Sequence, residues 1–186
     1  MSPAIAEVVA RYGIHPDMVP MLEEFERVPQ ADTIEEARAT WSAFCRAANR
    51  PRPEGMTVSD SVVATAAFDI PVRTYRPTAA SDASPCIFYI HGGGFMTGDL
   101  DTNDTVAWGL AQETGAVVVS TDYRLAPESP FPAAHDDCYA ALCHVHDEPL
   151  VYGIDPSRIA AESSFMRSLR IPTLVSTALS ATRIST

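Results

Sequence analysis

The sequence predicts an α/β protein with a mostly parallel sheet and flanking helices. Residues 86–90 and 116–119 are short, continuous apolar runs, which are typical of strands buried on both faces. Helical spacing follows each run, at residues 102–113 and 131–146, and residues 158–160 are expected to open a further strand. Strand and helix therefore alternate along the chain, as the crossovers of a parallel sheet require.

The first fifty residues predict helices. Ser2 followed by Pro3 is a helix start, with a capping residue before proline in the first turn. Thr33 and Glu36 have the spacing of a capping box. Trp41 and Phe44 follow at helical spacing, and this aromatic stripe suits either core packing or the lining of a pocket.

The chain is expected to divide into three regions. Residues 1–50 form an N-terminal helical region, and residues 51–160 form the α/β part. The latter begins with two strands, predicted at 58–66 and 72–75 around a turn. Residues 161–186 differ in composition and are treated as a divergent tail.

Composition and charge exclude several classes of protein. The chain has 186 residues, which suits one domain, and a net charge of -11, which disfavours nucleic acid and anionic membranes as partners. Its first ten residues lack the pattern of a secretory signal, and no apolar run approaches the roughly 18 residues of a membrane span. We therefore expect a cytoplasmic protein with reduced cysteines.

Three histidines and two cysteines lie close together in the sequence between residues 135 and 146, which raises the hypothesis of a metal site. On the predicted helix, His135 and Cys138 share a face, whereas Cys143 lies well round the helix from Cys138. One ion cannot easily collect these ligands, and no paired C-x-x-C spacing supports a zinc site. The spacing therefore predicts no metal site.

A glycine triplet follows the first buried strand directly. His91, Gly92, Gly93, Gly94 and Phe95 are consecutive. Three glycines cost conformational entropy on folding, so a local requirement must retain them. One explanation is a tight turn with positive φ; the other is a pair of main-chain N–H groups that bind the oxygen of an attacked acyl carbonyl.

Three further blocks accompany this triplet, at residues 122–128 (DYRLAPE), 131–134 (FPAA) and 153–160 (GIDPSRIA). In this order and spacing, the four blocks resemble the hormone-sensitive-lipase-like branch of the α/β-hydrolase family, which includes many bacterial carboxylesterases. The resemblance covers residues 56–160, and the N-terminal helices stand in the place of the family's cap.

The resemblance implies a function and a set of site residues. Gly93 and Gly94 match the two oxyanion donors, and His91 and Gly92 match positions that shape the loop. Residues 122–128 are assigned a structural role, and the substrate-pocket candidates are Trp41, Phe44 and Phe95. The implied reaction is hydrolysis of short- to medium-chain acyl esters through a serine acyl-enzyme, with a small-molecule ester as substrate and no cofactor.

The resemblance stops where the family's nucleophile is expected. The family places a G-x-S-x-G elbow after the last matched strand, but no glycine follows Gly153 here. The last aspartate is Asp155 and the last histidine is His146, so the other triad members are missing as well. Ser164 is the remaining nucleophile candidate, and without a base it is an ordinary alcohol. We expect this chain to be catalytically dead or nearly so.

The composition changes abruptly at the same point. Residues 161–186 contain six serines, four threonines and three arginines but no glycine and one acid, whereas all nine glycines precede them. The two explanations are a reading-frame change, which leaves the enzyme truncated, and a naturally divergent tail.

An incomplete sheet follows from either explanation. The family's sheet has more strands than this chain supplies, so a parallel edge would remain unpaired and favour poor solubility or self-association. Two alternatives to a broken enzyme stay open. The chain could be a non-catalytic binding module derived from the hydrolase fold, or a separate chain could supply the missing half.

The coding DNA distinguishes the two explanations of the tail. If the frame has changed, another frame just past the Ala160 codon will encode Gly-Asp-Ser-Ala-Gly-Gly, because the family's elbow belongs there. Reading the three frames checks this. Absence of the elbow in every frame would make the tail native and favour the binding module.

Overall fold

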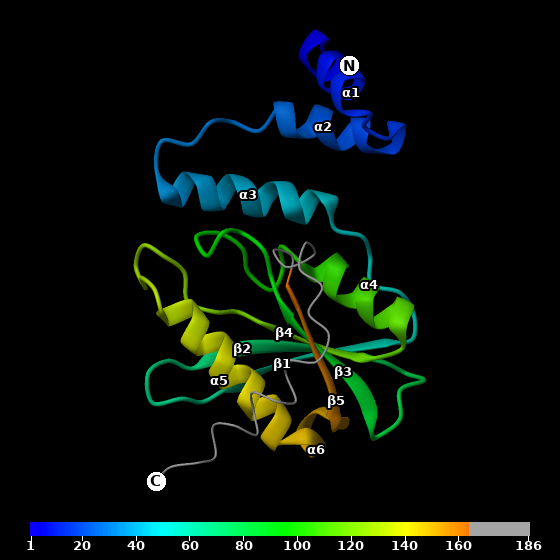
Figure 1. Ribbon diagram of the computed structural model, residues 1–186, viewed down its shortest axis with the longest axis vertical. Coiled ribbons are helices and arrows are strands. Elements are labelled where there is room, and N and C mark those ends of the chain that lie inside the picture. Colours follow the sequence, from blue (N-terminus) through cyan, green and yellow to red (C-terminus); the bar gives the residue numbers. More distant parts are fainter. Residues whose placement is uncertain (164–186) are drawn as a thin grey trace.

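Three N-terminal helices lie on one side of a five-stranded sheet (Figure 1). The computed structural model describes residues 1–163. The helices are α1 (Pro3–Tyr12), α2 (Val19–Glu26) and α3 (Ile34–Ala48), with a 3₁₀ turn at Pro16–Met18 between the first two. In the view of Figure 1, α3 lies nearest the sheet.

Both predicted helix starts are confirmed. The Ser2 side chain accepts a hydrogen bond from the amide of Ile5, with Pro3 in the first turn. The Thr33 hydroxyl accepts from the Glu36 amide at 3.2 Å, and the Glu36 carboxylate accepts from the Thr33 amide at 3.3 Å. This capping box sets where α3 begins and hence which residues it turns toward the sheet.

The described sheet is mixed, with strand order β1-β2-β4-β3-β5. Its pairings are antiparallel between β1 and β2 and between β2 and β4, and parallel between β3 and β4 and between β3 and β5. The predicted α/β fold is confirmed, with antiparallel strands at one side of a parallel core. The strands are β1 (Met56–Val63), β2 (Ile70–Pro77), β3 (Ser84–Ile90), β4 (Val117–Thr121) and β5 (Ile154–Ser163).

Some strand boundaries differ from those expected. β1 ends at Val63 because the chain turns there: the Thr65 hydroxyl accepts from the amides of Ala67 and Phe68. β5 begins at Ile154, before the expected residue 158, since Ile154 already pairs with Ser84 of β3. A register shift follows that pair. Turn bonds and neighbouring strands, which the apolar pattern does not report, set these limits.

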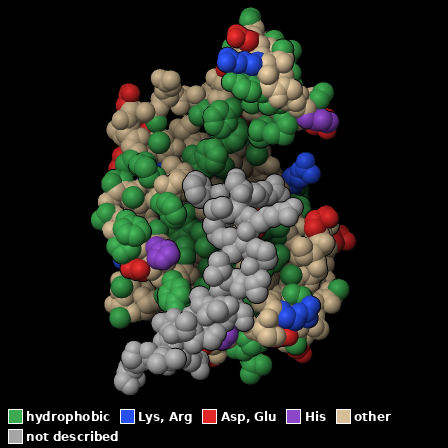
Figure 2. All heavy atoms as spheres, in the orientation of Figure 1, with side chains coloured by type: hydrophobic (Ala, Val, Ile, Leu, Met, Phe, Trp, Pro, Cys, Tyr) green, Lys and Arg blue, Asp and Glu red, His purple; other side chains and the backbone are tan. Residues whose placement is uncertain are grey.

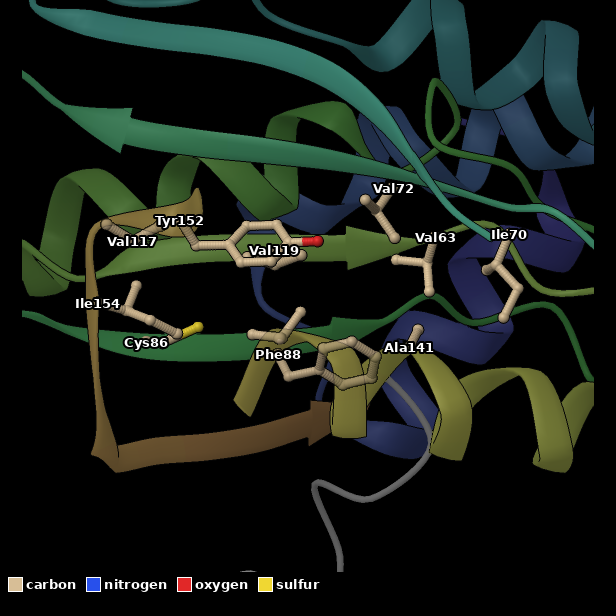
Figure 3. Packing of buried hydrophobic residues seen from close by; sticks show 11 residues of the cluster. Val63, Ile70, Val72, Cys86, Phe88, Val117, Val119, Ala141, Tyr152 and Ile154 are labelled. Atoms are coloured by element: carbon tan, nitrogen blue, oxygen red, sulfur yellow. The ribbon is translucent and has the colours of Figure 1, made fainter. Parts of the chain in front are cut away.

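Helices cover both faces of the sheet. Against one face packs α5 (Ala133–Asp147), where Ala141 meets a buried cluster that includes Phe88 and Val119 (Figure 3). Against the other packs α4 (Asp104–Thr114), whose Ala107 and Ala111 contact Tyr75, Tyr89 and Val118. Neighbouring valines of β4 thus point to opposite faces, as strand geometry requires. A short helix, α6 (Pro149–Tyr152), leads into β5.

A partly buried ion network joins the segment between α3 and β1 to the sheet and to α4. Asp104 accepts from Arg52 at 2.6 Å, from the Tyr75 hydroxyl at 2.9 Å and from Arg73 at 3.3 Å. Its side chain is 11% exposed, and that of Arg73 is 12% exposed. Burial opposes ionisation of Asp104, but the hydrogen bonds from Arg52 and Tyr75 outweigh it and hold its pKa below the usual value. The network fixes the segment between α3 and β1 against the domain.

Removing the charge of Asp104 will destabilise the fold more than removing that of Asp60, which also binds Arg73. Asp104→Asn removes the carboxylate partner of Arg52 and one of the three carboxylates that bind the buried Arg73, and is expected to lower the free energy of unfolding by about 3 kcal/mol. The Asp60 side chain is 59% exposed, and Asp60→Asn will cost about 1 kcal/mol or less. Urea denaturation of the two variants checks this, and equal losses would contradict it.

Candidate active site

The candidate site lies where β3, β4 and β5 end. These strands are parallel, so their carboxyl ends meet at one edge, where α/β proteins commonly bind ligands. The glycine loop, residues 91–101, follows β3 at this edge and contains the glycine triplet. Ser163, the last residue of β5, pairs in register with Ile90, directly before the loop.

The backbone turns back on itself at Gly93. Its carbonyl accepts from the amides of Met96 at 3.1 Å and Thr97 at 3.0 Å, and from the Thr97 hydroxyl at 3.1 Å. Gly93 has φ of 131°, and a Cβ there would lie 2.0 Å from the Thr97 carbonyl oxygen. No side chain fits this turn, which therefore requires glycine.

The amides of Gly93 and Gly94 differ from those of Met96 and Thr97, which donate to the Gly93 carbonyl. Within residues 1–163, neither Gly93 nor Gly94 donates its N–H to another group. Gly94 has φ of 62°, and a Cβ there would meet no atom within 4 Å. Both glycines line a pocket of about 510 Å³, together with Ile90, His91, Gly92, Phe95, Tyr123 and Ser163.

His91 supports the loop from beneath. Its ring is buried and stacks on Tyr123 with centroids 4.3 Å apart, and the Tyr123 hydroxyl donates to the His91 carbonyl at 2.7 Å. Nδ1 lies 2.9 Å from the Gly92 carbonyl, and Nε2 lies 3.8 Å from a carboxylate oxygen of Asp122. Burial lowers the pKa of His91, so the ring is neutral near pH 7 and donates from Nδ1. A Cβ on Gly98 would lie 2.5 Å from Nδ1, so the backbone closes over the ring.

The segment after β4 braces this arrangement. Arg124 donates to Asp137 of α5 from its amide and from both sides of its guanidinium, at 2.7 to 3.0 Å. Because Asp137 is buried, this bidentate pair fixes the segment firmly to α5. Tyr123 lies beside Arg124 and is thereby held against His91.

Phe95 lies between two pockets. It has φ of 63°, which is uncommon for a residue with a side chain, and its ring is half exposed. Besides the larger pocket, it lines a second one of about 220 Å³. The sequence did not predict this second pocket, although Phe131, Pro132 and Ala134 of the FPAA block line it. Its other lining residues are Ala126, Ser129 and His135.

Trp41 and Phe44 pack elsewhere. Their rings stack 5.8 Å apart, and both contact the ring of Phe25 in α2. Figure 2 shows hydrophobic side chains gathered around α2 and α3 on the face in view. Phe44 lines a pocket of about 470 Å³ between these helices, and neither ring is among the described residues that line the glycine-loop pocket.

The described residues hold no complete triad. Ser163 lines the glycine-loop pocket, and His91 is the one histidine that does so within residues 1–163. Ser164 lies outside the described residues. In the same part of the chain, no three acidic, histidine or cysteine side chains are grouped as metal ligands, and no helix is long and apolar enough to cross a membrane.

Sequence comparisons relate the chain to known ester hydrolases. A family described as alpha/beta hydrolase fold matches residues 87–161. Carboxylesterase NlhH of Mycobacterium tuberculosis is 42% identical over 153 residues, which are 82% of this chain and 48% of the relative. The ethyl acetate hydrolase of Pseudomonas putida is 42% identical over 93 residues, or 49% of this chain and 29% of the relative.

A solved structure extends the likeness to three dimensions. The hyperthermophilic esterase of the archaeon Pyrobaculum calidifontis superimposes with a TM-score of 0.71 at 34% identity. The match covers 81% of this chain and 49% of the esterase. The chain thus spans about half the length of NlhH and of this esterase.

Asp122 makes the stability of the site depend on pH. Burial, and then the charges of Asp99 and Asp101, raise its pKa to about 6. Because the folded pKa exceeds the unfolded value of about 3.9, Asp122 stabilises the fold below about pH 4 and this contribution is lost as pH rises through 6. Asp122→Asn should therefore gain about 1–2 kcal/mol over the wild type between pH 4 and 7.

Urea denaturation at a series of pH values measures this gain. The exposed variant Asp17→Asn serves as the control, since its side chain is 90% exposed. If the free energies of unfolding of the wild type and of Asp122→Asn vary with pH in parallel, ionisation of Asp122 does not destabilise the fold.

Proposed function

Because the chain belongs to the α/β-hydrolase family, in its hormone-sensitive-lipase-like carboxylesterase branch, we propose that its glycine loop is the oxyanion hole of a carboxylic ester hydrolase. One observation carries the proposal. Gly93 and Gly94 line a pocket at the carboxyl end of β3, and within residues 1–163 their N–H groups have no other acceptor.

The chemistry of ester hydrolysis uses two such donors. Attack on an acyl carbonyl places negative charge on its oxygen, and the amides of Gly93 and Gly94 stabilise that charge. Each donor of this kind lowers the barrier by about 3 kcal/mol. The reaction needs no metal or cofactor. The pocket is largely apolar and suits a short or medium acyl chain, with Phe95 at its border. The N-terminal helices serve as its cap.

The nucleophilic step needs groups that this sequence does not encode in the family's pattern. A serine must be deprotonated by a histidine that a carboxylate orients. No G-x-S-x-G occurs in the 186 residues, and no histidine follows His146. Ser163 and Ser164 are therefore ordinary alcohols, and we expect the chain by itself to hydrolyse esters at a negligible rate.

A second candidate function rests on the edge of the sheet. Among the described strands, β5 is terminal and pairs with β3 alone. An edge strand offers unpaired main-chain groups to another chain. A binding module derived from the hydrolase fold would use this edge, and a dimer of fixed stoichiometry or a co-purifying partner would favour it over the enzyme.

Titration with butyrate tests the oxyanion hole without requiring catalysis. A carboxylate oxygen carries the charge that the reacting carbonyl oxygen develops, and a hydrogen bond to it shifts the donor amide resonance. In ¹⁵N-labelled protein, the Gly93 and Gly94 amides should shift saturably with butyrate at constant ionic strength. Gly115 and Gly153, which lie at helix ends away from the pocket, should not shift.

Propylammonium chloride is the matched ligand control, because it has the propyl chain of butyrate and its ammonium group accepts no hydrogen bond. Gly94→Ala is the variant control: a Cβ has room there, but φ of 62° disfavours it, so the loop should distort and the response weaken. Unmoved Gly93 and Gly94 amides would refute the proposal. Hydrolysis of p-nitrophenyl butyrate that disappears in Ser164→Ala would refute the expected inactivity.

A further inference from the structure

Arg38 of α3 makes the most extensive polar contact between the N-terminal helices and the glycine loop. Its Nε donates to the Met96 carbonyl at 2.7 Å, and its Nη2 donates to the Ala126 carbonyl at 2.8 Å. The same guanidinium donates to both carboxylate oxygens of Glu128, at 2.8 and 2.7 Å. One side chain thus holds two separate stretches of backbone.

These two stretches meet at a main-chain hydrogen bond. The Ala126 amide donates to the Phe95 carbonyl at 2.8 Å, so the acceptors of Arg38 lie directly beside it in the sequence. Among the described non-glycine residues, Phe95 alone has a positive φ. Such a conformation persists where surrounding contacts enforce it. Arg38 and Ala126 together fix the two carbonyls that follow Gly94.

We propose that Arg38 is a positioning residue, which holds the glycine loop in its donor conformation only while α3 is docked on the domain. The inference rests on the proposed oxyanion function. It makes the helical segment a part of the site, although neither Trp41 nor Phe44 lines the glycine-loop pocket.

A second set of contacts holds the far end of the loop. Arg46, two turns after Arg38 in α3, lies 3.2 Å from Asp99, and the Asn49 side chain donates to the Asp101 carbonyl at 2.7 Å. Helix α3 therefore spans the loop from Met96 to Asp101. Its basic side chains meet acidic partners, in a chain whose net charge is -11.

The geometry requires arginine. The planar guanidinium of Arg38 donates four hydrogen bonds to three residues. The ammonium of lysine is a point charge and cannot reproduce this fork. The bond from Arg38 lowers the pKa of Glu128 to about 2. Glu128 therefore stays ionised over the pH range in which Asp122 titrates. A change of pH that protonates Asp122 consequently leaves the Arg38–Glu128 pair charged.

Three full-length variants test the inference. Arg38→Lys keeps the charge and loses the fork, Glu128→Gln keeps both carbonyl bonds, and Arg27→Lys alters an exposed arginine that follows α2 and pairs with Glu24. For Arg38→Lys, we expect hydrogen exchange at Met96 and Thr97 to rise, and butyrate affinity at Gly93 and Gly94 to fall, each by about tenfold. Exchange in β3 and β4 should be unchanged. Glu128→Gln should have a smaller effect and Arg27→Lys none.

Chemical rescue separates positioning from general stability. In Arg38→Ala, millimolar ethylguanidinium should restore butyrate binding, whereas ethylammonium should not, because only the former reproduces the fork. Arg38→Lys equal to Arg27→Lys in exchange and affinity would overturn the inference. If the amide resonances of wild-type Gly93 and Gly94 do not shift with butyrate, the proposed oxyanion function is refuted. The exchange rates at Met96 and Thr97 still test the role of Arg38.

Discussion

The site depends on one chain reversal, in which the Gly93 carbonyl turns inward to Met96 and Thr97. Three donors converge on that oxygen, and the Thr97 carbonyl occupies the space that a Cβ on Gly93 would need. The inward bonds satisfy the Gly93 carbonyl, while the Gly93 and Gly94 amides have no internal acceptor within the described residues. Such prior arrangement is what electrostatic stabilisation of a reacting oxygen requires, since no reorganisation is then needed during the reaction.

Two independent parts of the chain hold this reversal. From the sheet, Tyr123 supports His91 by stacking and by a hydrogen bond, and the Arg124–Asp137 pair anchors Tyr123 to α5. From the helical side, Arg38 fixes the carbonyl of Met96, which lies 58 residues later in the sequence. The loop is thus enclosed between the domain and a distant helix. The N-terminal helices consequently contribute to loop geometry through polar contacts, while their aromatic rings pack among themselves.

The sequence predicted the architecture well because local signals and packing agree. The capping box at Thr33 and Glu36 and the apolar run of β4 correspond to the observed elements. The boundaries of β1 and β5 were less accurate, since the Thr65 turn and pairing with Ser84 determine them. The antiparallel pairing of β1 with β2 follows from the short turn predicted between them, whereas that of β2 with β4 was not predicted, because burial patterns do not reveal strand direction.

The site was predictable only in part. The glycine triplet was visible as a motif, and its position at the end of β3 follows from the strand before it. Arg38, Phe131 and His135 could not be found, because arginine on a helix is ordinarily solvated and the second pocket forms only when residues 126–135 fold beside Phe95. The proposed roles of Trp41 and Phe44 stay predictions. The assignments for residues 164–186, Ser164 among them, lie outside the described part.

A crystal structure of the chain with bound butyrate would show whether the Gly93 and Gly94 amides form an oxyanion hole. We expect one carboxylate oxygen about 2.7–3.1 Å from the amide nitrogens of both glycines, with the alkyl chain in the pocket that they line. Butyrate bound away from these two nitrogens, or Gly93 and Gly94 amides bonded to the protein's own carbonyls in the crystal, would contradict the proposed oxyanion hole.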